Sequence, residues 1–130
     1  MAWSVPGRLL ALMLAAVLAL AGGETLIAKG MKTVGDLPGR WTAQVMAALG
    51  NGWIWAGGGL LLLHLALYMA ALGKSDLSLV LPLTALSYPL TALLASYTLG
   101  EHVGPTRWVG TALITAGVAV VGLGESLAPR

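Results

Sequence analysis

Long apolar runs separated by short polar segments dominate the chain. Residues 77–99 form 23 positions without a charged side chain, and residues 108–123 form 16 more. A helix rises about 1.5 Å per residue, so 23 residues reach about 34 Å, which exceeds the hydrocarbon thickness of a bilayer, about 30 Å. The second run also crosses if its helix begins near Pro105, because proline is tolerated in the first helical turn.

Two more apolar runs lie upstream, at residues 9–28, where only Glu24 is charged, and at 53–72, where no residue is charged. The pattern therefore predicts one domain over residues 1–130. Its four spans are expected at about residues 8–29, 53–72, 77–99 and 104–124. A secretory signal peptide remains an alternative for the start, because Arg8 precedes the apolar run and Ala19-Leu20-Ala21 fits a cleavage site.

The polar connection between the first two spans contains a short amphipathic pattern. Trp41, Val45 and Leu49 recur at helical spacing on one face. We expect a short interfacial helix here, with its aromatic ring at the depth of the lipid headgroups.

The apolar runs are continuous, whereas barrel strands alternate apolar and polar positions, so helices are favoured over a closed barrel. Composition agrees, since 58% of residues are hydrophobic and 9% are charged, against about 25% charged in soluble domains. The sequence thus predicts an all-α integral membrane protein in a lipid bilayer. A formal charge of +2 does not indicate nucleic acid, and the lack of cysteine excludes disulfides and thiolate metal sites.

Positive charges are distributed almost evenly between the two sides of a four-span topology. The side with the termini and the second loop carries Arg8, Lys74 and Arg130, and the other side carries Lys29, Lys32, Arg40 and Arg107. Orientation follows a clear Lys/Arg bias, which is missing here. Insertion in both orientations and a single weakly signalled orientation both remain open.

Proline and glycine mark special positions within the spans. Pro82 and Pro89 lie inside the third span, and each removes a backbone hydrogen bond and bends the helix. Gly110, Gly117 and Gly124 repeat every seven residues in the fourth span. Small residues let helices approach closely, so we expect a packing seam here, either within the chain or across a dimer.

Three segments resemble EamA-type proteins of the drug/metabolite transporter superfamily. They are residues 99–103 (LGEHV) with 108–118 (WVGTALITAGV), residues 79–88 (LVLPLTALSY) and residues 22–31 (GGETLIAKGM). A four-helix unit has the size of small multidrug resistance proteins and of the subunits of the aminoarabinose-lipid flippase. The resemblance implies a bacterial inner-membrane transporter that pairs with an identical or similar four-helix subunit.

Glu24 is the candidate for transport chemistry, because a carboxylate in hydrocarbon costs at least about 2.5–3.5 kcal/mol. Low-dielectric surroundings disfavour its charged form, so it can hold and release a proton, as a proton-coupled antiporter requires. Alternatively it reaches the interface or pairs with Lys29, although the two lie about 140° apart around the helix. In multidrug exporters the essential glutamate lies further before the lysine, at Ala21 here. Glu24 resembles the flippase-type arrangement more.

The other candidates each have an ordinary structural alternative. Lys29 could bind an anionic headgroup or phosphate, or simply reach the interface. His64 and Tyr68 share a helix face and either line a path or hydrogen-bond between helices. Tyr88, with nearby Ser87, Thr84 and Thr91, gives the third span a polar side. Those hydroxyls either face a pore or bond to their own helix. Glu101 is expected to cap the third loop.

We expect a transporter that exports or flips a small metabolite, drug or lipid-linked headgroup by alternating access, as a homodimer or heterodimer. The alternatives are a non-transporting subunit of a larger flippase or enzyme complex and a proton-coupled exporter of cationic drugs. No phosphate-binding glycine loop, metal-ligand cluster or catalytic Ser/His/Asp set occurs in the sequence. We therefore expect no enzyme activity and no cofactor or metal.

Overall fold

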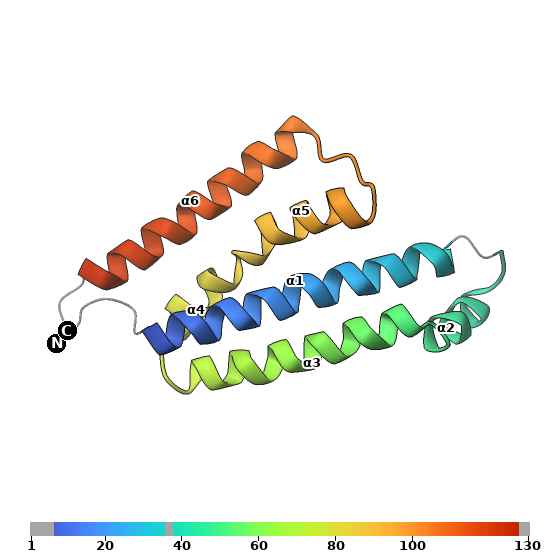
Figure 1. Cartoon of the computed structure of the whole chain (residues 1–130), viewed down its shortest axis with the longest axis horizontal. Coiled ribbons are helices and arrows are strands. Elements are labelled where there is room, and N and C mark those ends of the chain that lie inside the picture. Colours follow the sequence, from blue (N-terminus) through green and yellow to red (C-terminus); the bar gives the residue numbers. More distant parts are fainter. Residues whose placement is uncertain (1–6, 36–37, 128–130) are drawn as a thin grey trace.

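The structure is a computed structural model that describes residues 7–35 and 38–127, with side chains described up to residue 124. These residues form six helices and no strand (Figure 1). The helices are α1 (Gly7–Gly35), α2 (Trp41–Leu49), α3 (Gly52–Leu72), α4 (Leu77–Thr84), α5 (Ser87–Thr98) and α6 (Pro105–Leu127).

Within the described part, four helical segments are long and apolar enough to cross a membrane. They are α1, α3, the consecutive α4 and α5, and α6 as far as Gly124. The short α2 lies between the first two crossings, where the amphipathic pattern predicted it. The all-α, four-span fold class is therefore confirmed.

Helix α1 is longer than the first apolar run. Its 29 residues reach about 43 Å, and it continues past Lys29 to Gly35. Met31 and Lys32 are good helix formers, and Gly30 costs only about 1 kcal/mol. As a result, Lys29 and Lys32 both project from an ordered helix rather than from a loop.

Helices α1 and α3 pack at very short range through glycine. A Cβ placed on Gly57 would lie 2.6 Å from the carbonyl oxygen of Gly23, and one on Gly23 would lie 2.9 Å from the carbonyl oxygen of Gly57. Gly58 and Gly59 have open space where their side chains would be. The glycine run in α3 thus marks a close neighbour at one position, and the helix continues through it without a break.

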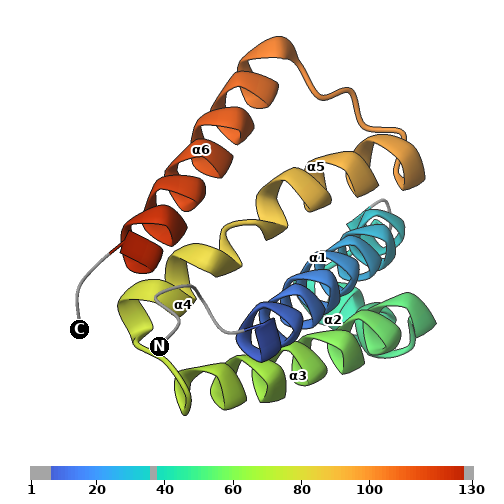
Figure 2. The same ribbon diagram turned by 60° about the vertical axis from the view of Figure 1, so that its left-hand side comes forward.

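The third crossing is interrupted between its two prolines. Pro82 lies inside α4 and Pro89 in the first turn of α5, and the helix is broken at Ala85 and Leu86. Proline cannot donate a backbone N–H. The carbonyl of Ala85 instead accepts from the N–H of Tyr88 at 3.1 Å. The break turns the two halves of this crossing relative to each other (Figure 2).

The hydrophobic core lies at one end of the bundle. Its buried residues come from the start of α1, the end of α3, α4 and the C-terminal half of α6: Leu9, Met13, Ala71, Leu79, Val80, Leu83 and Val118. From this end α6 runs obliquely to the other helices (Figures 1 and 2). Two cavities lie between α1, the crossing formed by α4 and α5, and α6.

Candidate functional site

Glu24 faces a cavity between α1 and the broken third crossing. The cavity measures about 380 Å³, and its lining residues are Leu20, Glu24, Leu81, Thr84, Ala85, Ser87, Tyr88 and Thr91. The hydroxyl of Thr91 donates to a carboxylate oxygen of Glu24 at 3.3 Å. No cationic side chain lies within 4 Å of this carboxylate in the described part of the chain. An acidic group surrounded by hydroxyls and one aromatic ring can bind an organic cation.

The break in the third crossing shapes this cavity. Leu81 and Thr84 reach it from α4, while Ser87, Tyr88 and Thr91 reach it from α5. Of the serine and threonine hydroxyls considered above, that of Thr84 bonds to its own helix, at the carbonyl of Leu81. Thr91 instead bonds across to α1. Thr91, which hydrogen-bonds to Glu24, therefore connects α5 to α1.

A second cavity adjoins the first and shares Tyr88 and Thr91 with it. It measures about 410 Å³ and lies between α5, the α5–α6 loop and α6. Its remaining lining residues are Ala92, Ala95, Glu101, Val103, Arg107, Gly110, Thr111 and Ile114. Arg107 makes no ion pair with any described residue. The two cavities together present two acidic side chains, Glu24 and Glu101, and one basic side chain, Arg107.

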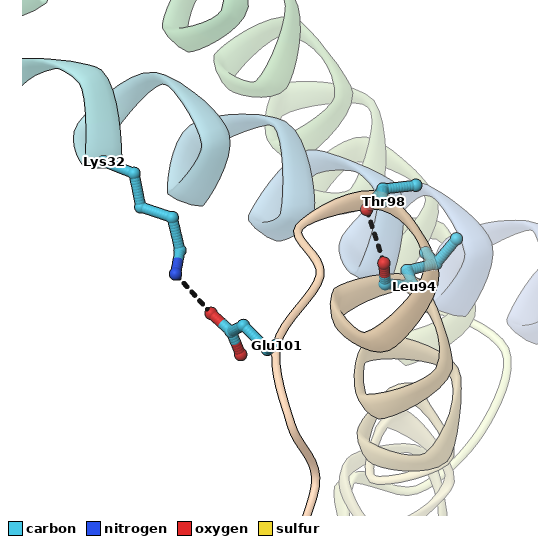
Figure 3. Close-up of polar contacts among 4 residues, drawn as sticks. All are labelled: Lys32, Leu94, Thr98 and Glu101. Carbon is cyan, nitrogen blue, oxygen red and sulfur yellow. Dashed lines mark hydrogen bonds and ion pairs between the residues drawn. The ribbon is translucent and has the colours of Figure 1, made fainter.

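The α5–α6 loop is tied to α1 at the mouth of the second cavity. Gly100 follows α5 with a φ of 65°, a left-handed conformation that glycine adopts without steric cost. The next residue, Glu101, places a carboxylate oxygen 2.8 Å from the ammonium of Lys32 (Figure 3). The hydroxyl of Thr98 in the last turn of α5 donates to the carbonyl of Leu94 (Figure 3). The ion pair of Glu101 and Lys32 thus joins the α5–α6 loop to α1.

Lys29 lies apart from these cavities. Its ammonium sits 4.1 Å from the centre of the Trp53 ring, at the start of α3. Such a cation–π contact stabilises the amine at the interface. Lys29 and Glu24 are on the same helix, but they face different neighbours: α3 for the lysine and α5 for the glutamate.

His64 connects α3 to α1. Its Nδ1 lies 2.8 Å from the carbonyl oxygen of Ala16, so the nitrogen must carry the proton and donate. The ring stacks on that of Tyr68, with centroids 5.8 Å apart. Neither residue lines the two cavities. The geometry favours the hydrogen-bonding alternative over a path-lining role.

The glycine stripe of α6 faces open space. A Cβ on Gly110, Gly117 or Gly124 would meet no described atom within 4 Å. Close helix approach within the chain occurs instead between α1 and α3, at Gly23 and Gly57. The stripe is free to receive a second subunit, and this use of it remains a prediction.

The sequence indicated Glu24 and Tyr88, but it did not single out Arg107 as a site residue. In the sequence Arg107 contributes only to the positive charge before the fourth span. A usable signal was present: Arg107, Thr111 and Ile114 recur at helical spacing, which places the cation and a hydroxyl on one face of α6.

Two bacterial proteins show what this chain is similar to. One is the probable 4-amino-4-deoxy-L-arabinose-phosphoundecaprenol flippase subunit ArnE of Pseudomonas savastanoi pv. phaseolicola. It is 35% identical over 78 residues, which cover 60% of this chain and 68% of that protein. The protein of the same name from Pseudomonas fluorescens is 26% identical over 104 residues, covering 74% of this chain and 91% of the relative.

No family model and no solved structure matches the chain. The two relatives, together with the four apolar helices, confirm a multi-pass transport protein of the bacterial inner membrane rather than an enzyme. The chain belongs to the family of ArnE-type flippase subunits, which are small four-helix proteins related to the drug/metabolite transporters.

Proposed function

We propose that the protein is a subunit of a flippase for a lipid-linked aminosugar, and that Glu24 binds the amine of the headgroup. The observation that carries this proposal is the carboxylate of Glu24 in a cavity of about 380 Å³, with no cationic side chain of the described residues within 4 Å of it. A charge inside an apolar span is costly, so a substrate ammonium that neutralises it is bound favourably. The relatives are probable flippase subunits for an amino-deoxy sugar on a phosphoundecaprenol, and this lipid carries such a group.

The position of Glu24 favours this function over proton-coupled export of cationic drugs. Ala21 stands where the exporters carry their glutamate, and it is 1% exposed. The carbonyl of Ala21 accepts the hydroxyl of Thr25 at 2.7 Å. A carboxylate at position 21 would therefore be buried among packed residues, while Glu24 opens onto the cavity.

The test uses the substrate's own amine as the reporter. The full chain, with any subunit that co-purifies, is placed in proteoliposomes containing the aminosugar-linked lipid. A membrane-impermeant amine-reactive reagent then labels headgroups in the outer leaflet, so flipping appears as label gained with time. We expect Glu24→Gln to abolish protein-dependent flipping, because the amide has the same shape but no charge.

Asp76→Asn is the matched control. Asp76 is an exposed carboxylate just before α4 and lines neither cavity. The Asp76→Asn protein should flip lipid at the wild-type rate. A Glu24→Gln protein that flips as fast as the Asp76→Asn protein would disprove the role of Glu24.

We further propose that a second four-helix subunit completes the site on the side of α6. Support comes from the open glycine stripe and from the exposed apolar side chains of this helix, such as Leu113 and Val120. The chain contains no cysteine, so single cysteines can be introduced on an unreactive background. Gly117→Cys should form a disulfide-linked dimer in membranes, while Leu14→Cys on the exposed face of α1 should not.

The mass of that product distinguishes the two kinds of dimer. Twice the mass of this chain indicates a homodimer. A different mass appearing only when a related subunit carrying its own cysteine is co-expressed indicates a heterodimer. Failure of Gly117→Cys to cross-link under either condition would place the partner elsewhere. Recovery only within a larger assembly would favour the docking-subunit alternative.

A further inference from the structure

The two cavities continue into a third, and their chemistry changes in a definite order. The third is an apolar groove of about 490 Å³ along α5 and α6, lined by Pro89, Trp108, Thr111, Ala112, Thr115, Ala116 and Ala119. It shares Thr111 with the second cavity, which in turn shares Tyr88 and Thr91 with the first. The surface therefore runs without interruption from an acidic side chain, past a basic one, to an apolar groove on the outer helix.

We propose that Arg107 is the phosphate-binding residue of this track, and that the third cavity holds the adjoining part of the lipid tail. This inference rests on the proposed function for the substrate class, and it deepens that proposal by placing the rest of the molecule. An aminosugar phospholipid carries an amine, a phosphate and a polyprenyl chain in that order. The three cavities offer Glu24, Arg107 and apolar side chains in the same order.

The charge balance of the second cavity permits an anion there. Glu101 also lines this cavity, and its carboxylate would repel a phosphate. Its Oε1, however, lies 2.8 Å from the ammonium of Lys32, so the pair is neutral overall. Arg107 has no such partner among the described residues. A guanidinium matches the geometry of phosphate oxygens better than an ammonium does.

The depth of each group also fits a lipid. Arg107 is in the first turn of α6, at the end of the bundle that carries Lys32 and the α5–α6 loop. From Trp108 to Ala119 the groove follows about 16 Å of helix, which leads from that end toward the middle of the membrane. Glu24 precedes Lys32 by two helical turns, so the amine of the lipid would lie inside the bundle. The lipid tail would lie in the groove along α5 and α6. The phosphate would remain near the headgroup layer.

Lys29, the cation expected from the sequence to bind the anion, is less suitable. Its ammonium is held over the Trp53 ring against α3, and it lines none of the three cavities. The proposal therefore moves the phosphate from the end of α1 to the start of α6. This change can be tested directly with matched variants.

The experiment measures binding of two lipids that differ only in the phosphate group. The full chain, with any subunit that co-purifies, is reconstituted in nanodiscs and titrated with undecaprenyl phosphate or with neutral undecaprenol. Neither lipid has an amine, so the titration does not depend on Glu24. We expect Arg107→Gln to weaken the binding of undecaprenyl phosphate by at least about tenfold, the typical value of a hydrogen bond to a charged group. The affinity for undecaprenol should stay unchanged.

Controls separate charge from folding and lipid from free anion. Arg40→Gln removes an exposed arginine outside the cavities and should bind like the wild type. Arg107→Lys keeps the charge and should recover part of the lost affinity. The proposal is overturned if Arg107→Gln binds undecaprenyl phosphate normally or loses both lipids equally. It is also overturned if inorganic phosphate competes with the same affinity as the lipid.

The two proposals can fail separately. Loss of undecaprenyl phosphate binding in Arg107→Gln, with normal flipping by Glu24→Gln, would support the phosphate site and disprove the amine site. The reverse pattern would keep the amine site and overturn the one at Arg107.

Discussion

The contact between α1 and α3 makes a sharp prediction about Gly57→Ala. The added Cβ would lie 2.6 Å from the carbonyl oxygen of Gly23 and 2.7 Å from Cγ1 of Ile27. Ordinary contact begins at 3.4 Å, so the helices must separate by about 0.8 Å. The obstructing oxygen belongs to the backbone of α1, which cannot rotate away as a side chain can.

The magnitude follows from two opposing effects. Overpacking of this kind costs about 1–3 kcal/mol, while replacing glycine by alanine inside a helix contributes about 1 kcal/mol of stability. Gly58→Ala isolates the second effect, because its Cβ would meet no atom of the described residues within 4 Å. We therefore expect Gly57→Ala to be about 1–3 kcal/mol less stable than Gly58→Ala. Comparing the two variants cancels the helix-propensity term.

The assay is reversible unfolding in mixed micelles, following the far-UV circular dichroism as the fraction of denaturing detergent rises. Flipping is measured on the same preparations, because Gly23 is next to Glu24 and a shift of α1 changes the first cavity. We expect Gly57→Ala to unfold earlier and to flip more slowly than Gly58→Ala. Equal unfolding midpoints for the two variants would refute the close packing of α1 on α3.

Three further substitutions have expected outcomes. His64→Phe removes the hydrogen bond to Ala16 but keeps an aromatic ring. The free energy of unfolding should fall by about 0.6 kcal/mol, and by at most about 1.7 kcal/mol, while the rate of flipping stays unchanged. Loss of flipping in a stable His64→Phe protein would instead show that the histidine lines the substrate path. Lys29→Met should bind undecaprenyl phosphate within about twofold of the wild type, since this lysine lines no cavity, and a tenfold loss would contradict that placement. Lys32→Gln leaves the carboxylate of Glu101 unpaired in the second cavity, so undecaprenyl phosphate should bind more weakly. The free energy of unfolding should change by less than about 1 kcal/mol, as is usual when an exposed ion pair is lost. Unchanged lipid affinity would show that the carboxylate of Glu101 does not act on the anion.

The crossings could be predicted because a bilayer makes each one a local problem. Backbone groups in hydrocarbon must pair within their own helix, so a continuous apolar run of sufficient length decides its own conformation. Local chemistry also predicted the short α2, through its face of Trp41, Val45 and Leu49. The end of α1 differed, because residues 30–35 contain no strong helix breaker and the helix outlasts its apolar run. A charge marks the edge of a membrane span, but it does not end a helix.

The candidate site was predictable at Glu24, where a carboxylate interrupts an apolar span and its cost is visible in the sequence, and at the polar side of the third span around Tyr88. The partners of this residue come from far along the chain: Thr91 is 67 residues away, and no periodic pattern connects the two. The same holds for Lys29, which the structure pairs with an aromatic ring of α3 instead of a cavity. Hydropathy reports how deep a residue lies, whereas ligand chemistry depends on which side of the helix it faces.

The sequence by itself determined the membrane class, the helical conformation, the four crossings and one acidic position, because these follow from single helices meeting lipid. The tertiary structure decided which faces touch. Lipid tails are as apolar as leucine, so helices in a membrane associate through shape and polar contacts rather than through hydrophobicity. Shape selected Gly23 and Gly57 for the close contact and left the glycines of α6 open. The same packing set Arg107 and Glu24 along one surface.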